Sequence, residues 1–524
     1  MSWSSHSVNE IGATSRSCGV SLFRRFGRAA ALFTSVLLVV AITPERAGAT
    51  AAETSGRASD PASRLAARML ADTPLAEDLQ FLCDRIGGRL TGSDACERSV
   101  DWFVERFRQA GVDHVSTESF EMPWRWSDSG SRASVLHPES ISLDVVALPN
   151  SPGTSGAGLT TTVVDLADGG EQAFERAGAR LEGALGLLDS EVIVTWPDLF
   201  TDYMRVPPVI DRAKRAGMAG LLLVGSRAGD LLYRHIPSFE IPPFPMAVVA
   251  REDGLLLQRL TRAGTVRMKL DLGARIGPSY TARNVVAEIR GRERPDEVVL
   301  LGAHLDSWDL GTGALDNGAN CAMLLEVARQ MVALGQRPRR SVRVVLFTGE
   351  EQGLYGSLGY VQSHRDELDR IVAVAIFDEG TGRIGGFSLG GRDDLRPFVE
   401  RALEPVSGYG ATTHTVDAFL GTDNFDFLLE GVPNLVATQA ASNYMDNYHA
   451  SSDTFDKVDL RELRINGAIV AALAWNLADD PERPSRHDRA AVKKLLGATG
   501  VDDQMKTFGL WDDWFEGKRG RQKR

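Results

Sequence analysis

The sequence predicts an α/β protein in which a mixed, mostly parallel sheet is covered by helices on both faces and a β-rich module is inserted. From residue 280 onward, near-continuous apolar strands alternate with segments of helical periodicity, which is typical of a sheet buried on both sides. Between about 150 and 278 the pattern changes to short β-rich runs separated by Gly and Pro. At 524 residues the chain is also too long for a single ordinary core.

The composition is that of a globular protein, and its charge narrows the choice of partners. The formal net charge is −12, with 43% hydrophobic and 24% charged residues. Phosphate binding needs a dominant basic face, so this balance argues against a nucleic-acid partner.

The first 49 residues have the features of an export signal. An Arg-flanked apolar run, AAALFTSVLLVVAI at 29–42, is short for a membrane span and is followed by AGA at 47–49. We expect cleavage near Ala49 and a secreted or periplasmic product with no stable membrane insertion. The alternative is a membrane anchor formed by an uncleaved signal.

Three cysteines remain after that cleavage: Cys83, Cys96 and Cys321. An odd number fits no dense disulfide framework. Cys83 and Cys96 pair in an oxidising compartment or remain buried thiols, and the sequence leaves both alternatives open.

Composition and periodicity divide the chain into six segments. They are a signal peptide at 1–49, a flexible leader at 50–65, a first part of the main domain at 66–149, the β-rich insert at 150–278, a second part of the main domain at 279–480, and a polar C-terminal extension at 481–524. The first part is helical, and its second helix has Ser93 as N-cap candidate and ends at Gly111. For the extension we expect a peripheral helix or disorder.

The second part of the main domain contains strands that each lead into a loop and a helix. The predicted strands are EVVLLGAH at 297–304, SVRVVLFTGE at 341–350, RIVAVAIFDEG at 370–380 and PNLVATQ at 433–439. Ligands of such sheets bind beyond the carboxyl ends of the strands, so the residues that follow these strands are the candidates for chemistry.

Acidic or imidazole side chains follow three of these strands. They are His304, Asp306 and Asp316 after the first, Glu350 and Glu351 after the second, and Asp378 and Glu379 after the third. Solvated turns and acids at a helix N-terminus are the plainer explanations for any one of them. Three successive strand ends of this kind instead predict carboxylates that converge and repel one another unless a cation neutralises them.

Histidine and carboxylate ligands without cysteine suit Zn²⁺, with Mn²⁺ or Co²⁺ as substitutes. Five ligands with one bridging carboxylate would hold two ions about 3.5–4 Å apart, the arrangement of co-catalytic hydrolysis. His449, in a loop after a later strand, is the candidate for the fifth ligand.

Five motifs, in order, resemble those of the co-catalytic zinc exopeptidases of metallopeptidase family 28. They are HLDSWDLGTGALDNGAN, LFTGEEQGLYGS, IFDEGTG, GTDNFDF and YHASSDTFDKVD. The resemblance runs from about residue 70 to 480 and includes IGGRLTGS, and the insert resembles a protease-associated domain. It implies the zinc exopeptidase fold, two Zn²⁺ per chain, small peptides as substrates and a homodimer.

The resemblance also implies a role for each residue of the site. His304, Asp316 and Asp378 would bind one zinc, and Asp316, Glu351 and His449 the other, with Asp316 as the bridge. Glu350 matches the general base, and Asp306 would accept the other N–H of the ligand imidazole. Tyr448 would donate its hydroxyl to the oxyanion unless it is structural, and Asp423 would support the site or bind substrate.

Three positions depart from the pattern of the nearest relatives. Glu379 follows Asp378, and the D-x-G-T register favours Asp378 as the ligand. Asn317 stands where those relatives have a second aspartate, and Tyr448 stands where the carboxypeptidase branch has histidine. None of these changes removes a required ligand, but the last leaves the specificity open.

Two other classes of function compete with this interpretation. The pentapeptide GFSLG at 386–390 matches a nucleophile elbow with Ser388, although it lies in a glycine-rich run and not directly after a predicted strand. A non-catalytic binding or scaffold protein would need no metal. We predict an exported two-zinc exopeptidase of carboxypeptidase or dipeptidase type, with aminopeptidase activity as the alternative.

Overall fold

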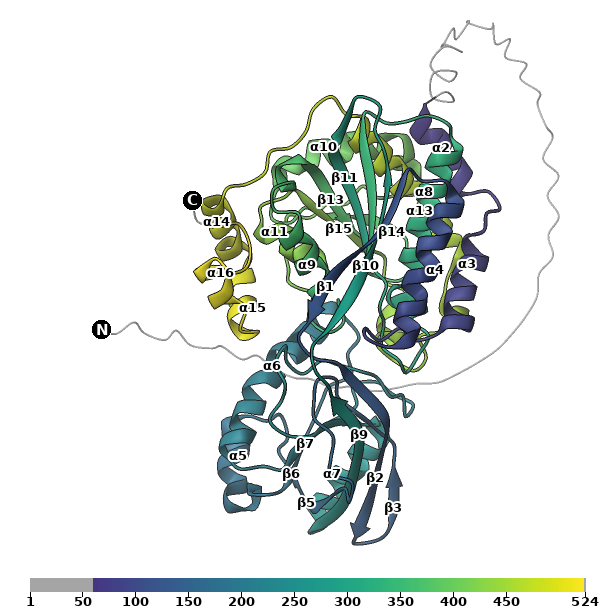
Figure 1. Cartoon of the computed structure of the whole chain (residues 1–524). Coiled ribbons are helices and arrows are strands. Elements are labelled where there is room, and N and C mark those ends of the chain that lie inside the picture. The colour runs from purple at the N-terminus through teal and green to yellow at the C-terminus, as the bar shows by residue number, and fades with distance from the viewer. Residues whose placement is uncertain (1–59, 523–524) are drawn as a thin grey trace, which may run out of the picture. The chain divides into compact units, whose positions relative to one another are not determined.

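The computed structural model describes residues 60–522, and the strands of this part form two sheets (Figure 1). The predicted signal peptide and most of the predicted leader therefore lie outside the described residues. No described helix is both long and apolar enough to cross a membrane.

The first sheet has seven strands in the order β1-β10-β12-β11-β13-β15-β14. Their bounds are β1 His114–Met122, β10 Tyr280–Ile289, β12 Arg340–Phe347, β11 Arg294–His304, β13 Ile371–Ile376, β15 Asn434–Gln439 and β14 Ile384–Ser388. The four strands β12, β11, β13 and β15 run parallel, and β1, β10 and β14 are antiparallel to their neighbours. The mixed α/β sheet is therefore confirmed, with a parallel centre and antiparallel edges.

Helices cover both faces of this sheet (Figure 1). The helices of one face are α2 Pro61–Met69, α3 Leu75–Phe81, α4 Asp94–Ala110, α8 Ala319–Ala333, α10 Arg396–Leu403 and α13 Leu460–Asp479, and those of the other are α9 Tyr355–Ser363 and α11 Asn424–Leu429. Successive side chains of a strand point to opposite faces, so Leu301 packs in the first core and Leu300 in the second. This two-sided burial explains why the strands read as continuous apolar runs.

Short helical turns connect these elements. They are η1 Leu82–Ile86, η2 Gly178–Leu181, η3 Ala314–Gly318, η4 Leu368–Arg370, η5 Asp393–Leu395, η6 Glu404–Tyr409, η7 Phe455–Lys457 and the four-residue α12 Tyr444–Asn447.

The first helices begin where capping chemistry permits. Asp60 accepts a hydrogen bond from the backbone N–H of Ser63, and Pro61 occupies the first turn of α2, so helix already begins inside the predicted leader. Ser93 caps α4, and Gly111 ends it with φ of 78°, as the sequence predicts.

The three cysteines Cys83, Cys96 and Cys321 are free and buried, so the open question of a Cys83–Cys96 disulfide is resolved in favour of thiols. Burial raises the pKa of the Cys83 thiol to about 12, which keeps it protonated and unreactive.

The second sheet has eight strands in the order β3-β2-β9-β5-β6-β7-β8-β4. Their bounds are β2 Trp126–His137, β3 Ile141–Leu143, β4 Val145–Ala147, β5 Leu159–Asp165, β6 Leu185–Leu188, β7 Gly220–Val224, β8 Met246–Val249 and β9 Val266–Ile276, and the accompanying helices are α5 Glu171–Ala177, α6 Trp196–Arg215 and α7 Arg251–Ala263. Strand β2 pairs along its length with β9, so the inserted unit begins at Trp126 and not near residue 150. It is an α/β unit rather than only β-rich, and its two cores also include Leu90, Trp308 and Ala450 from outside the unit.

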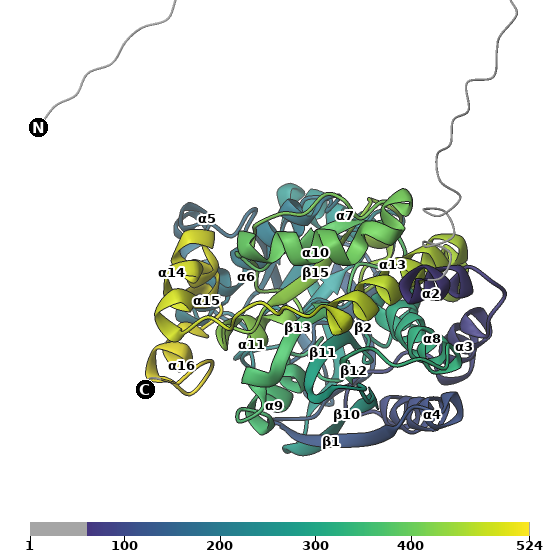
Figure 2. The same cartoon turned by 90° about the horizontal axis from the view of Figure 1, so that it is seen from above.

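The C-terminal extension is more than a peripheral helix. It forms α14 Arg489–Thr499, α15 Val501–Thr507 and α16 Trp511–Glu516, which lie beside α11 (Figure 2). The buried Trp514 shares a core with Phe425, and the Arg519 guanidinium pairs with the buried Asp426 carboxylate through two contacts of 2.8 Å. These apolar and charged contacts fix the extension to the domain that contains the first sheet.

Candidate metal centre

The candidate ligands come together because parallel strands end at the same edge of the first sheet. His304 is the last residue of β11 and lies opposite Phe347 of β12, and Glu350 and Glu351 follow Phe347 by three and four residues. On the other side of β11, Gly302 lies opposite Ile376, two residues before Asp378. The register therefore delivers ligand candidates from three adjacent strands to one place.

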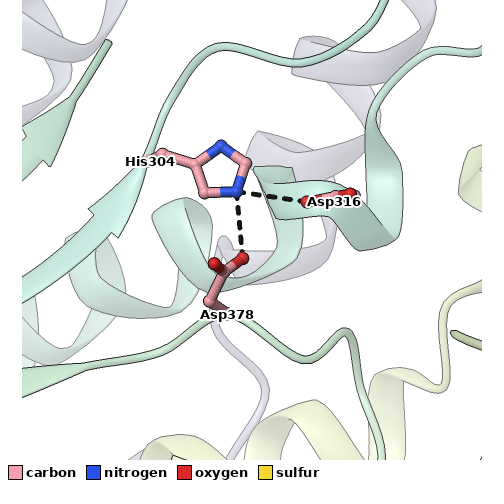
Figure 3. Close-up of side chains that lie close together, drawn as sticks. All are labelled: His304, Asp316 and Asp378. Atoms are coloured by element: carbon pink, nitrogen blue, oxygen red, sulfur yellow. Dashed lines mark hydrogen bonds and ion pairs between the residues drawn. The ribbon is translucent and has the colours of Figure 1, made fainter. Parts of the chain in front are cut away.

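The first group contains His304, Asp316 and Asp378 (Figure 3). His304 Nε2 lies 3.1 Å from Asp316 Oδ1 and 2.9 Å from Asp378 Oδ1. Asp316 comes from the turn η3, just ahead of α8. One imidazole nitrogen thus faces two carboxylate oxygens from separate loops.

The second group contains His449, Glu351 and the same Asp316. His449 Nε2 lies 3.3 Å from Asp316 Oδ2 and 2.9 Å from Glu351 Oε2. Asp316 therefore presents Oδ1 to one group and Oδ2 to the other, which is the geometry of a bridging carboxylate.

Hydrogen bonds to the other ring nitrogens leave both Nε2 atoms free to face the carboxylates. His304 Nδ1 lies 3.0 Å from the backbone carbonyl of Asp306, and His449 Nδ1 lies 3.0 Å from that of Arg234. A carbonyl only accepts, so each Nδ1 carries a proton, and Nε2 is the nitrogen that each neutral imidazole would offer to an ion. That tautomer is the one a metal ligand needs.

The surroundings of the two groups fit divalent cations. Asp316 is 4% and Glu351 5% exposed, and Asp316 Oδ2 and Glu351 Oε1 have no hydrogen-bond donor among residues 60–522. Burial, reinforced by the charge of Asp316, raises the pKa of Glu351 well above its usual range. Buried carboxylates that lie beside the ring nitrogens of two histidines gain most from a cation placed between them.

Glu350 stands beside these groups without belonging to either. Its backbone N–H lies 3.4 Å from Asp306 Oδ1, whereas its carboxylate forms no hydrogen bond or ion pair with a described residue. Burial raises the pKa of Glu350 well above its usual range, and the neighbouring charges of Asp378 and Glu351 add to this. A carboxylate in this state can take up a proton near neutral pH.

The chain is similar in sequence and fold to several known proteins. The sequence model described as Peptidase family M28 matches residues 284–474. The chain is 30% identical to carboxypeptidase Q of Rattus norvegicus over 421 residues, which cover 78% of this chain and 85% of that protein. It is 28% identical to the probable lipoprotein aminopeptidase LpqL of Mycobacterium tuberculosis over 439 residues, which cover 76% and 82%. The crystal structure of a peptidase M28 precursor from Shewanella amazonensis SB2B matches with a TM-score of 0.74 and 29% identity, over 82% of this chain and 98% of that one.

The chain belongs to peptidase family M28. The resemblance to this family and to carboxypeptidase Q, also called plasma glutamate carboxypeptidase, is thereby confirmed, and the protein is a metallo-exopeptidase. A non-catalytic scaffold is accordingly not supported.

The structure separates the two adjacent acids of the M28 motif IFDEGTG. Asp378 faces His304, while Glu379 accepts a 2.6 Å hydrogen bond from the backbone N–H of Gln439. Asp378 is therefore the acid at the site, as the D-x-G-T register indicates. Asn317, the neutral departure, donates from Nδ2 to the Phe377 carbonyl and ties the bridging turn to β13.

Asp306 has a different partner from the one we expected. Its carboxylate lies 3.7 Å from His304 Nδ1, and its own backbone carbonyl accepts the hydrogen bond from that nitrogen instead. The carboxylate accepts a 2.8 Å hydrogen bond from the Thr91 hydroxyl, and Thr91 in turn accepts one from the backbone N–H of Gly349. Asp306 thus links the loop after β11 to the loop after β12.

Tyr448 and Asp423 occupy contrasting positions. The Tyr448 ring stacks on His449 with centroids 3.7 Å apart, and its hydroxyl lies 3.2 Å from that of Tyr203 on α6. Asp423 is completely buried, and burial raises its pKa well above the usual range. Both carboxylate oxygens of Asp423 are buried and lack a hydrogen-bond partner among residues 60–522.

Ser388 does not have the surroundings of a nucleophile. Contrary to our expectation it does end a strand, β14, but that strand is the antiparallel edge of the sheet. Ser388 as a whole is 1% exposed, and its hydroxyl donates to the Asp417 carbonyl at 3.0 Å. A nucleophile elbow instead presents an exposed serine above a parallel strand.

Sequence reasoning missed the residues that hold the ligand loops in place. Asp453 accepts hydrogen bonds from the backbone N–H groups of Leu315, at 2.7 Å, and Asp316, at 3.1 Å. The fully buried Arg89, in the motif IGGRLTGS, donates to the carbonyls of Gly87, Leu305, Thr312 and Gly313. Both residues lie in motifs that the sequence singles out, but no spacing rule says which backbone groups they bind.

Proposed function

We propose that the protein is an exported two-zinc exopeptidase that hydrolyses small peptides, of carboxypeptidase or dipeptidase type. The observation that carries the proposal is the shared Asp316, whose two oxygens face two separate histidine and carboxylate groups. One ion would be held by His304, Asp316 and Asp378, and the other by Asp316, Glu351 and His449. Neutral imidazole and carboxylate donors suit Zn²⁺.

When bound, two such ions lower the pKa of a water molecule and polarise the scissile carbonyl. Glu350 would accept a proton from that water on its free carboxylate and pass it to the departing amine. The hydroxyl of Tyr448, whose ring stacks on His449, would donate to the oxyanion that develops on the carbonyl oxygen.

We further propose that the inserted unit, residues 126–276, is a protease-associated domain that completes the site. Its Arg234 carbonyl fixes the tautomer of His449, and its Tyr203 hydroxyl contacts Tyr448. Both contacts reach the ligand loop from outside the first sheet, so the insert contributes to the chemistry and not only to the surface.

Aminopeptidase activity is the second candidate. It is favoured by Tyr448, which stands where the carboxypeptidase branch of the family has histidine, and by the similarity to a probable lipoprotein aminopeptidase. The metal chemistry of the two activities is the same, and only the recognition of the peptide terminus differs.

The test uses the purified chain, its zinc content and a matched set of dipeptides. About two zinc ions per chain by elemental analysis, with hydrolysis lost on chelation and restored by Zn²⁺, is the expected result. Each dipeptide is offered free, with an acetylated N-terminus and with an amidated C-terminus. Cleavage of the acetylated peptides would exclude an aminopeptidase, whereas cleavage that requires a free N-terminus and tolerates the amide would overturn the carboxypeptidase proposal.

A further inference from the structure

Arg227, which follows β7 in the inserted unit, is a buried cation without an acidic partner. It is 4% exposed. Its Nη1 donates to the carbonyl of Ser226 at 3.4 Å and to the hydroxyl of the same residue at 3.1 Å, and its guanidinium lies 5.2 Å from the ring centroid of Tyr233. No described carboxylate forms an ion pair with it, and the buried Nε has no hydrogen-bond partner in residues 60–522.

The other buried arginines of the described chain are compensated. Arg234 pairs with Asp128 and Asp309, Arg340 with Glu297, Arg392 with Asp394 and Arg519 with Asp426, and Arg89 donates to four carbonyls. A guanidinium has five N–H donors, so Arg227 keeps most of its donors unused. An uncompensated buried cation is costly for folding, and such a group is retained where it binds something.

Asp202, a carboxylate that interacts electrostatically with Arg227, is already bound to other side chains. Its Oδ1 accepts a 2.6 Å hydrogen bond from Arg205, and its Oδ2 lies 3.8 Å from His235 Nε2. Besides Asp202, the ionisable side chains that interact with Arg227 include the hydroxyls of Tyr203, Tyr233 and Tyr448 and the imidazoles of His235 and His449. The charge of Arg227 is therefore available to a ligand.

A continuous chain of contacts joins Arg227 to the candidate metal centre. The Tyr233 hydroxyl accepts from Ser226 N at 3.1 Å, and Tyr233 forms an antiparallel bridge with Ala450, the residue after His449. Along the same layer, His235 stacks on Tyr203 at 4.0 Å, and the Tyr203 hydroxyl meets that of Tyr448. Arg227 thus belongs to the layer of the insert that packs on the ligand loop.

We propose that Arg227 binds the α-carboxylate of the C-terminal residue of the peptide substrate. The inference rests on the proposed function, and it supplies the terminus recognition that distinguishes a carboxypeptidase or dipeptidase from an aminopeptidase. The planar guanidinium fork matches a carboxylate through two parallel hydrogen bonds. A fixed cation at this place also repels a substrate ammonium group, so it favours binding through the carboxyl terminus.

The test compares Arg227→Gln and Arg227→Lys with the wild type on dipeptides that end in a free carboxylate or in an amide. Loss of a hydrogen-bonded charge pair predicts a fall of kcat/KM by about 10- to 100-fold for the free carboxylate, mainly through KM. The amide should change by less than about threefold, because it makes no ion pair in either protein. Arg227→Lys keeps the charge but not the planar guanidinium, so its kcat/KM for the free carboxylate should lie between those of the wild type and Arg227→Gln.

Binding gives a second readout that does not depend on turnover. An N-acetyl amino acid should inhibit the wild type competitively and Arg227→Gln at least about tenfold more weakly, whereas the corresponding amide should inhibit both equally. Arg212→Gln is the matched control, because Arg212 lies on α6 of the same unit and, within residues 60–522, donates only to the Gly169 carbonyl. The control should leave every constant unchanged.

Three outcomes separate the two proposals. Equal losses on the free and amidated peptides, or no loss on either, would overturn the role of Arg227 while the metallopeptidase stands. A wild type that cleaves neither peptide would overturn the proposed function itself. If Arg227→Gln does not fold, Arg227→Lys decides: a fall on the free carboxylate alone supports the proposal, and wild-type constants refute it.

Discussion

Asp453 offers the sharpest test of how the ligand loop is built. Its carboxylate is 3% exposed by residue and accepts the backbone N–H groups of Leu315 and Asp316 with separate oxygens. In Asp453→Asn one oxygen becomes an NH₂ group, which faces one of these N–H donors and leaves it buried without an acceptor. An unsatisfied buried donor costs about 1–3 kcal/mol, and the surviving bond loses its charge assistance, so we expect a loss of about 2–4 kcal/mol of stability.

The same substitution should weaken metal binding, because the turn that presents Asp316 is no longer fixed. Replacement of groups that orient metal ligands lowers affinity by about 10- to 100-fold. Zinc affinity is measured by competition with a chromophoric chelator, and stability by urea unfolding of the metal-free chain. The control is Asp456→Asn, which removes the same charge from a side chain that is 68% exposed in the same loop. Wild-type zinc affinity in Asp453→Asn would show that the turn is held by other contacts and would refute the reasoning.

Three further predictions follow from the described contacts. Glu350→Gln should retain the wild-type zinc content but lower kcat by about 10²- to 10⁴-fold, and near-normal turnover would remove Glu350 as the base. Arg519→Met should lower the free energy of unfolding by about 3–5 kcal/mol, because it leaves the buried Asp426 carboxylate unpaired; an unchanged urea midpoint would contradict this. Burial lowers the pKa of His364, but the Glu118 carboxylate at 2.9 Å and a second glutamate outweigh it and raise the pKa above the usual value. The resulting stability is present below about pH 6.5 and lost as the pH rises through the raised pKa, so His364→Gln should lower the melting temperature more at about pH 5.5 than at about pH 8.5.

The convergence of the candidate ligands could be predicted from sequence because these residues obey a simple geometric rule. Parallel strands end at one edge, and His304 and Asp378 each follow such a strand at short range. His449 follows no strand directly and was inferred only because the site lacked a ligand. The residues that hold the ligand loops in place obey no comparable rule. Asp453 accepts hydrogen bonds from backbone N–H groups 137 and 138 residues away, and the sequence around Asp453 does not indicate these partners.

The ends of the chain show a related limit of sequence patterns. The extension after residue 480 is polar overall, and each of its helices buries only a few side chains, such as Val492, Met505 and Trp514. Hydrophobic periodicity is weak over such short helices, so tertiary contacts decide whether they pack. The inserted unit likewise begins at Trp126 because β2 pairs with β9, and pairing between strands so distant in sequence leaves no local signal at the boundary.

The inserted unit makes contacts with the candidate site that its sequence does not indicate. The sequence of this unit contains the isolated His235 and no cluster of histidines and carboxylates that would indicate chemistry. Yet the carbonyl that fixes the His449 tautomer and the hydroxyl that meets Tyr448 both come from the insert, 215 and 245 residues before their partners. A backbone carbonyl carries no sequence signature at all. The peptidase domain therefore supplies the candidate ligands, whereas the tautomer of one of them, His449, is fixed by a carbonyl of the inserted unit.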